Sequence, residues 1–323
     1  MQNIVVIIPA YNEEKTISEI VNRIIKLKNE INNYSVVVID DGSTDRTSEL
    51  GRNSGAVVVR HERNSGVGKS VQDGIRFALE NNADIAIIID ADMQYDPDDI
   101  NILIEPILEG RADFVTANRF IDSEGNVNYP TRMPKIKYWG NKQMAKLVNR
   151  LAGTALGDVS SGFRALNREA LLNLNLSGNF TYTHEMILDL SVKELRLASV
   201  PMKVRYFAER KSRVAGNLAH YGFQALRIIF KEFKDYKPFR FFGSLSLIPL
   251  VLGFISLIFM AIVYLITGGF SPFKFIGFIG IYLFSLGIIL IIVGFLADIL
   301  VGIRRTQEKI LYYQKKQNYS SNN

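Results

Sequence analysis

Short apolar runs alternate with helix-like patterns in the N-terminal part of the chain. The runs that predict strands by their length and β-branched content are Ile4–Ile8, Val36–Ile39, Ala56–Val59 and Ile85–Ile89. Because these runs are continuously apolar, we expect both faces of the sheet to be covered. Apolar side chains at helical spacing follow the first strand at Ile17–Ile25 and the third at Val71–Leu79. This alternation predicts an α/β fold, with a mostly parallel sheet and flanking helices.

Two much longer apolar runs, Phe241–Ile266 and Phe275–Ala297, occupy the C-terminal part of the chain. No charged residue lies between Arg240 and Lys274. Each run exceeds the roughly 20 apolar residues that cross a bilayer. We therefore predict a hairpin of two transmembrane helices, at about residues 241–267 and 275–300.

Basic residues gather on both outer sides of this hairpin, whereas the segment between the two spans has only Lys274. They are Arg227, Lys231, Lys234, Lys237 and Arg240 before the first span, and Arg304, Arg305, Lys309, Lys315 and Lys316 after the second. The positive-inside bias predicts a two-span protein of the cell membrane whose α/β domain and both termini are cytoplasmic.

These patterns divide the chain into four parts. Residues 1–215 form the α/β domain, and 216–240 a basic, amphipathic juxtamembrane segment suited to a lipid surface. Residues 241–302 form the hairpin, and 303–323 a basic cytoplasmic tail. The tail is polar from Gln314 onward, and there we expect no regular structure.

The composition narrows the chemistry. The chain has no cysteine and three histidines, which excludes disulfides, a thiol nucleophile and cysteine-based metal sites. The net charge of +6 suits an anionic partner. Because the basic residues cluster beside the predicted spans, we expect that partner to be a lipid bilayer rather than nucleic acid.

Acidic and amide side chains follow the fourth strand, at Asp90, Asp92 and Gln94. Alternate residues of an extended segment point the same way, so their oxygens can face one hard cation. Mg²⁺ or Mn²⁺ is the expected ion, held by one or two carboxylates together with substrate phosphates. The ordinary alternative is a solvated, helix-capping pair of aspartates.

A glycine-rich turn, Gly66-Val67-Gly68-Lys69-Ser70, is similar to a phosphate-binding loop. The Walker A pattern requires glycine where this chain has Arg63, which excludes a P-loop ATPase or GTPase. Lys69 can still approach a nucleotide from the start of the following helix. Three further arginines are phosphate-binding candidates, with an ordinary surface charge as the alternative: Arg119 after a strand-like run, Arg132 in a Gly- and Asn-rich stretch, and Arg164.

Four motifs in this order resemble family 2 glycosyltransferases of the GT-A fold. They are Pro9-Ala10-Tyr11-Asn12-Glu13, Asp40-Asp41-Gly42-Ser43, Asp90-x-Asp92-x-Gln94 and Ser161-Gly162-Phe163-Arg164. The last motif and the C-terminal hairpin resemble the branch that glycosylates polyprenyl phosphates, such as the dolichyl-phosphate mannose and glucose synthases. The resemblance covers about residues 1–215.

The resemblance implies an inverting enzyme that transfers a sugar from a nucleotide-sugar to polyprenyl or dolichyl phosphate. It places Asp92 and Gln94 on Mg²⁺ or Mn²⁺, Arg119 on the diphosphate, and Glu185 on the sugar or acceptor. The residues implied for the nucleotide-sugar are Pro9, Ala10, Tyr11, Glu13, Asp40, Asp41, Asp90 and Ala91, to which Lys69 is added from its turn. For the acceptor phosphate the resemblance implies Ser212 and Arg213, to which Arg132 and Arg210 are added as arginines suited to a phosphate.

Several alternatives stay open. The donor can be UDP-glucose, UDP-N-acetylglucosamine or GDP-mannose, and self-association is undetermined. A processive polysaccharide synthase resembles the same sheet, but the single tryptophan, Trp139, follows Ile136-Lys137-Tyr138 and so lacks that class's Gln-x-x-Arg-Trp signature. A non-catalytic membrane adaptor that binds nucleotide-sugar or anionic lipid is the other alternative.

The Ser212-Arg213 pair generates a first prediction. Replacing Arg213 with alanine removes a cation expected to hold the acceptor phosphate. We expect Arg213→Ala to raise the apparent acceptor KM or to lower kcat, measured in steady-state transfer assays with the lipid acceptor varied. An effect confined to donor binding contradicts the assignment.

Overall fold

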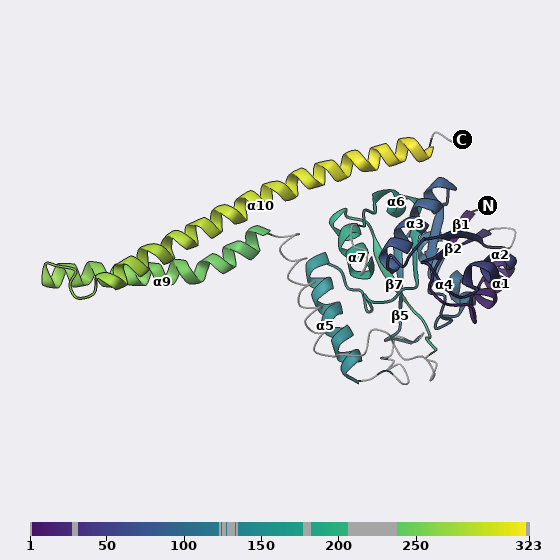
Figure 1. Ribbon diagram of the computed structural model, residues 1–323, viewed down its shortest axis with the longest axis horizontal. Coiled ribbons are helices and arrows are strands. Elements are labelled where there is room, and N and C mark those ends of the chain that lie inside the picture. The colour runs from purple at the N-terminus through teal and green to yellow at the C-terminus, as the bar shows by residue number, and fades with distance from the viewer. Residues whose placement is uncertain are drawn as a thin grey trace. The chain divides into compact units, whose positions relative to one another are not determined.

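The structure is a computed structural model that describes residues 2–27, 32–122, 124, 127, 133, 135–176, 182–205 and 238–320 (Figure 1). The chain forms two compact units. The first, here called the α/β unit, comprises Met1–Lys211 together with Leu311–Asn323. The second, the helical unit, comprises Ser212–Ile310.

The α/β unit is built on a seven-stranded sheet with the strand order β3-β2-β1-β4-β6-β5-β7. Its strands are β1 (Gln2–Ala10), β2 (Asn32–Asp40), β3 (Val57–Arg60), β4 (Ile85–Ile88), β5 (Phe114–Asn118), β6 (Arg164–Asn167) and β7 (Leu197–Pro201). All neighbouring pairs are parallel except those of β6, which runs antiparallel to β4 and β5. The mostly parallel sheet and all four predicted strands are confirmed.

Helices cover both faces of this sheet (Figure 1). They are α1 (Ile17–Lys26), α2 (Thr47–Asn53), α3 (Val67–Glu80), a short 3-10 turn η1 (Pro97–Asp99), α4 (Ile100–Leu108), α5 (Lys135–Ala152), α6 (Arg168–Asn173) and α7 (Tyr182–Val192). Helices α1 and α4 contribute apolar side chains to one core with alternate residues of β1, β2 and β4. The helices predicted at Ile17–Ile25 and Val71–Leu79 are both present, as α1 and within α3.

The register brings the carboxyl ends of three strands to one edge. Ala10 at the end of β1 pairs with Asp40 at the end of β2, and β4 ends beside β1, with Ile88 paired to Ile7. In open parallel sheets ligands bind outside this edge. The polar motifs of the sequence therefore start at the place where a ligand is expected.

Helix α3 packs on the sheet through a glycine. A Cβ built on Gly74 would lie 2.2 Å from Ile7 Cγ2, so only a residue without a side chain allows α3 to lie this close to β1. Ile7 is fully buried. Because α3 begins at the turn after Gly66, this contact also sets the position of that turn at the sheet edge.

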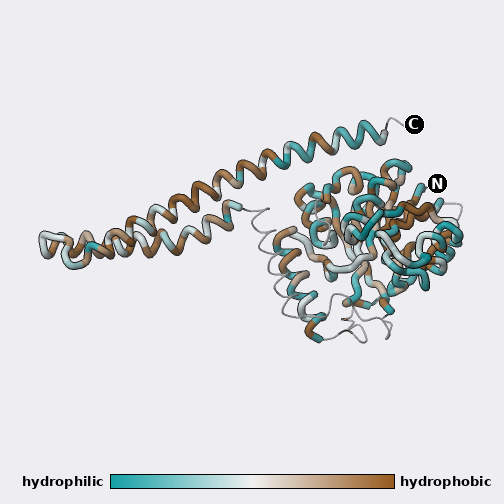
Figure 2. The backbone as a smooth tube through the Cα atoms, in the orientation of Figure 1, coloured by the Kyte–Doolittle hydropathy of each residue, from teal (hydrophilic) through white to brown (hydrophobic). Residues whose placement is uncertain are grey.

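The predicted hairpin is formed by α9 (Pro238–Thr267) and α10 (Lys274–Ser320), and the helical unit contains it up to Ile310. Both helices are long and apolar enough to cross a membrane, and Figure 2 shows their hydrophobic character along most of the hairpin. Small residues allow the two helices to approach: a Cβ on Gly253 would lie 2.6 Å from the Phe284 nitrogen, and one on Gly287 would lie 2.4 Å from Leu250 Cγ. Small interfacial residues of this kind are typical of membrane helix pairs.

The expectation of an irregular tail from Gln314 is wrong, because α10 continues to Ser320. Its last turns belong to the α/β unit and are hydrogen-bonded there. Tyr312 Oη donates to Glu169 Oε1 at 2.7 Å, and Lys315 Nζ donates to the Leu174 carbonyl and to Asn175 Oδ1, each at 2.8 Å. These contacts to α6 and the residues after it, in a segment without glycine or proline, stabilise the helix.

Some predicted features lie outside the described residues. These are most of the juxtamembrane segment at 216–240 and the four acceptor-phosphate candidates Arg132, Arg210, Ser212 and Arg213.

The close approach at Gly74 gives a stability prediction. We expect Gly74→Ala to lower the free energy of unfolding by about 1–3 kcal/mol, because the added methyl group overpacks against Ile7. Chemical denaturation of the detergent-solubilised protein measures the change. The matched control is Gly140→Ala in α5, where a Cβ meets no atom within 4 Å. This variant should be stabilised by about 0.5–1 kcal/mol, and equal effects in the two variants would contradict the packing argument.

Candidate active site

The loops that follow β1 and β2 are joined by hydrogen bonds. Asn12, whose φ of 56° is left-handed, accepts at Oδ1 from the Thr44 N–H at 2.8 Å. Its own N–H donates to Ser43 Oγ at 2.9 Å, and the Glu13 N–H donates to Thr47 Oγ1 at 2.8 Å. The two loops therefore form one assembly at the sheet edge.

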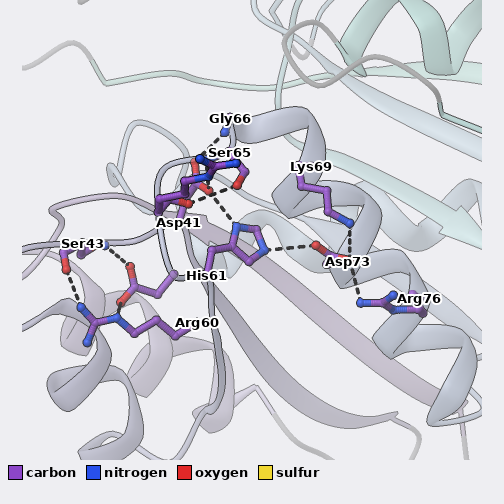
Figure 3. Close-up of polar contacts among 11 residues, drawn as sticks. Asp41, Ser43, Arg60, His61, Ser65, Gly66, Lys69, Asp73 and Arg76 are labelled. Carbon is purple, nitrogen blue, oxygen red and sulfur yellow. Dashed lines mark hydrogen bonds and ion pairs between the residues drawn. The ribbon is translucent and has the colours of Figure 1, made fainter.

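Asp40 and Asp41 turn into the protein and hold these loops in place. Asp40 is fully buried, and its Oδ1 accepts from the Ser43 N–H at 2.8 Å. Asp41 accepts from the N–H groups of Ser65 at 2.8 Å and Gly66 at 2.9 Å, which fixes the turn that opens α3 (Figure 3). The contacts of both carboxylates with a nucleotide stay predictions.

His61 links Asp41 to α3 (Figure 3). Its Nδ1 lies 2.7 Å from Asp41 Oδ1, and its Nε2 lies 3.1 Å from Asp73 Oδ2. Asp73 Oδ1 also accepts from Lys69 Nζ at 3.0 Å and from Arg76 Nη2 at 2.7 Å. Lys69 is thus ion-paired within its own helix, with 42% of its side chain exposed, and its contact with a nucleotide stays a prediction.

The loop after β4 presents Asp92 and Gln94 at the same edge. Asp92 Oδ1 accepts from the Gln94 N–H at 3.0 Å, which closes a tight turn around Met93, whose φ is 58°. Both Asp92 and Gln94 stay partly exposed, whereas Ala91 and Met93 are buried in the core. The turn therefore directs the polar residues outward and the apolar ones inward, but it replaces the extended segment that the sequence predicts here.

Asp90 lies deeper than Asp92, at the end of the strand. Part of the residue reaches solvent, but burial of the carboxyl group raises its pKa to about 7, and the neighbouring charges of Asp92 and Glu13 act in the same direction. The guanidinium groups of Arg119 and Arg164 oppose this shift. Three carboxyl groups and two arginines from separate parts of the sequence are therefore close enough to interact.

Arg119, at the end of β5, is held by a second carboxylate. Its Nε donates to Asp158 Oδ2 at 2.6 Å and its Nη2 to Asp158 Oδ1 at 3.1 Å, a two-point contact in which Asp158 is buried. Lys137 of α5 interacts with Arg119. Burial and the positive charge of Arg119 both lower the pKa of Lys137. Arg119 is thus fixed in orientation next to a second cation.

Arg164 is buried completely, so neither sequence interpretation, a phosphate ligand or a surface charge, is correct for it. Its three nitrogens donate to the carbonyls of Ser161 at 2.8 Å, Val159 at 2.9 Å and Thr183 at 2.6 Å. Burial lowers its pKa to about 10, which leaves the group charged at neutral pH. Arg164 therefore holds the 159–161 loop and the start of α7 to β6.

Gly162 lies directly against Asp90. A Cβ built on Gly162 would lie 2.4 Å from Asp90 Oδ2, so the carboxyl group occupies the space that any other residue's side chain would need. The Ser161-Gly162-Phe163-Arg164 motif thus has a geometric basis. Gly162 makes room for the carboxyl group, and Arg164 fixes the loop that carries Gly162.

The first turn of α7 contains Glu185 and His184. Glu185 is partly exposed, and its role stays a prediction. His184 Nε2 lies 3.4 Å from Ser160 Oγ, and its buried Nδ1 has no hydrogen-bond partner among the described residues. Burial and the charge of Arg164 lower the pKa of His184 to about 4, so the ring is neutral at physiological pH.

The donor set fits a hard divalent cation bound jointly with a substrate. Among the described residues no group of three or more His, Cys, Asp or Glu side chains forms a metal site of its own. The Asp92 carboxylate and the Gln94 amide nevertheless offer oxygens at a partly exposed turn, and Mg²⁺ is commonly held by one or two carboxylates plus substrate phosphates. Arg119 interacts electrostatically with Asp90, and Lys137 with Arg119, whereas the contact of Arg119 with such phosphates stays a prediction.

A comparison with protein families decides the classification. The profile described as glycosyl transferase family 2 matches residues 5–174, more than half of the chain. The chain belongs to this family. The match begins at β1 and ends just after α6, and it includes all four motifs on which the resemblance was based.

Two relatives of known name and one solved structure are similar to this chain. UDP-N-acetylglucosamine–dolichyl-phosphate N-acetylglucosaminyltransferase of Methanococcus voltae is 32% identical over 63% of this chain and 86% of its own. Dolichol-phosphate mannosyltransferase of Pyrococcus furiosus is 30% identical over 71% of this chain and 63% of its own. Glucosyl-3-phosphoglycerate synthase of Mycobacterium tuberculosis, crystallised with Mn²⁺, UDP-glucose and phosphoglyceric acid, has a TM-score of 0.55, with 24% identity over 72% of this chain and 79% of its own. The last similarity confirms the GT-A-like fold.

Sequence reasoning overlooked several residues of the family 2 site. Gly162 lies in the Ser161–Arg164 motif and Asp158 lies three residues before it, but the sequence does not reveal that they contact Asp90 and Arg119, respectively. Lys137 and His184 gave no signal, because their importance arises from neighbours far away in the sequence.

The contact between Gly162 and Asp90 predicts a loss of activity without a loss of fold. We expect Gly162→Ala to lower kcat about 10- to 100-fold, because the methyl group displaces the carboxyl group from its position. Sugar-transfer kinetics and the thermal midpoint are measured together. Gly140→Ala is the control. Wild-type kcat in a folded Gly162→Ala protein would show that the position of Asp90 is not critical.

Proposed function

We propose that this chain transfers a sugar from a nucleotide-sugar to a polyprenyl or dolichyl phosphate at the cytoplasmic side of a membrane. The observation that carries the proposal is the meeting of Asp90, Asp92 and Arg119 at the carboxyl edge of the sheet, in a chain with two candidate membrane spans. Acidic oxygens there suit a cation, the arginine suits a diphosphate, and the spans bring the protein to a lipid acceptor.

The relatives support this choice of acceptor and leave the donor sugar open. Both named relatives act, by their names, on dolichol-linked phosphate, one with N-acetylglucosamine and the other with mannose. We therefore assign the acceptor class to this chain and keep UDP-glucose, UDP-N-acetylglucosamine and GDP-mannose as candidate donors.

The mechanism we propose is a single in-line displacement at the anomeric carbon, with inversion. The acceptor phosphate oxygen forms the new bond to this carbon while the bond to the departing nucleoside diphosphate breaks. Asp92 and Gln94 would hold Mg²⁺ or Mn²⁺, whose charge stabilises the diphosphate. Arg119, oriented by Asp158, and Lys137 add positive charge on the protein side.

The acceptor lessens the need for a strong general base. A phosphate monoester is an anion at neutral pH, so its oxygen attacks without first losing a proton to the protein. We therefore propose that Glu185 and the neutral His184 orient the sugar or the acceptor. The predicted cytoplasmic orientation gives the site access to nucleotide-sugars.

A transfer assay tests this proposal. Membranes or nanodiscs containing the protein are incubated with polyprenyl phosphate, Mg²⁺ or Mn²⁺ and each radiolabelled donor in turn, and label is measured in the organic extract. We expect label from at least one donor. No labelled lipid from any donor would favour a non-catalytic adaptor, and a growing water-insoluble polymer would favour a polysaccharide synthase.

The carboxylate of Asp92 is tested in the same assay. We expect Asp92→Ala and Asp92→Asn to lower transfer at least about 100-fold, because electrostatic stabilisation of the leaving group is lost. Glu109→Ala, at an exposed carboxylate paired with Arg111, is the matched control and should keep wild-type activity. Near-normal turnover in a folded Asp92→Asn protein would exclude the proposed metal role.

A further inference from the structure

Helix α5 has an unusual distribution of charge. It contains Lys135, Lys137, Lys142, Lys146 and Arg150 and no acidic residue over its 18 positions. It lies at the edge of the α/β unit (Figure 1). Mixed charges are usual on the exposed face of a soluble helix, so a helix with basic residues alone indicates an anionic partner.

The two sides of α5 have different environments. Asn141, Ala145 and Val148 are buried and attach the helix to the α/β unit. The opposite side is exposed. From Ile136 onward its members recur at intervals of three or four residues, and Lys135 lies four residues before Trp139, which places them in one stripe along the helix. This stripe, here called the basic stripe, consists of Lys135, Ile136, Trp139, Lys142, Lys146 and Arg150.

The basic stripe also contains large apolar side chains. Trp139, the single tryptophan of the chain, is 63% exposed, and Ile136 is 52% exposed. Tryptophan is enriched where a protein meets the headgroup level of a bilayer, because its ring is apolar and its N–H is polar. Lysine and arginine beside it are attracted to anionic lipid.

We propose that the basic stripe of α5 binds the headgroup layer of an anionic bilayer, with Trp139 at the level of the headgroups. The lysines and Arg150 contact lipid phosphates on either side of it. Charge complementarity favours lipid over a second copy of the chain, because a symmetric contact would place basic stripe against basic stripe. The two candidate membrane spans keep the chain at a bilayer, which makes this partner available at all times.

The position of Lys137 connects this surface to the reaction. Lys137 lies one turn before the buried Asn141 on the same helix, is partly buried, and interacts with Arg119. Helix α5 therefore has phosphate-binding cations on its outer side and a cation of the candidate site on its inner side. This connection rests on the proposed function, whereas the binding of lipid by the basic stripe does not.

The single tryptophan allows a direct test with the full-length protein. The protein is reconstituted into nanodiscs of phosphatidylcholine alone or of phosphatidylcholine with phosphatidylglycerol, and Trp139 emission is recorded. We expect a blue shift, a several-fold increase in quenching by brominated lipid, and weaker quenching by aqueous acrylamide in the anionic discs. High salt should reverse these changes, because it screens the lysine–phosphate attraction.

Charge reversal tests the basic stripe, and the same reversal at basic residues elsewhere is the matched control. Lys142→Glu with Lys146→Glu should abolish the lipid-dependent changes, whereas Lys26→Glu with Arg52→Glu, at exposed basic residues of α1 and α2, should preserve them. The inactive Asp92→Ala protein should give the wild-type signal. The Trp139 measurement therefore tests lipid binding even if the protein transfers no sugar.

Three results would overturn the proposal. The first is Trp139 emission that is identical in the two kinds of disc and fully open to acrylamide. The second is a shift that depends on protein concentration in detergent, which would indicate a second copy of the chain. The third is a shift that appears only when nucleic acid is added.

Discussion

The close approach of the Asp90 carboxyl group to Gly162, which leaves no room for a side chain at this position, is the constraint on which the candidate site depends. It joins the end of β4 to the loop before β6, two strands that are antiparallel neighbours but lie far apart in the sequence. Arg164 extends the connection by donating to the Thr183 carbonyl at the start of α7. The donor side of the site and the helix that carries Glu185 are therefore linked by two residues of one short motif.

Pairing of buried charged groups keeps the candidate site compact. Burying an unpaired ion is costly, and here each buried cation has partners: Arg119 has the Asp158 carboxylate, and Arg164 has three carbonyls and two aromatic rings. Arg119 and Arg164 do not fully offset the burial of Asp90, whose pKa is raised by burial and by the repulsion between the carboxyl groups of Asp90 and Asp92. An additional positive charge would relieve their repulsion, and this fits a role for the site in binding a cation with its substrate.

The parts of the fold that the sequence predicts are those with local patterns. Continuous β-branched runs identify β1 to β4, and long uncharged runs identify the hairpin, because burial on both faces or in lipid leaves no polar positions. Strand β6 has no such pattern: it is four residues long and begins with a fully buried arginine. The motifs indicate which loops matter, but the inward orientation of Asp40 and Asp41 and the pairing of Arg119 with Asp158 depend on contacts between distant residues.

The final turns of α10 affect how this protein can be shortened for study. A soluble fragment cut before α9 would lose the apolar helices and also the polar segment whose Tyr312 and Lys315 are bound to α6 and to the residues after it. Glu169, the Leu174 carbonyl and Asn175 would then lose these hydrogen-bond partners. Supplying residues 311–320 as a fused or separate peptide would preserve that part of the α/β unit.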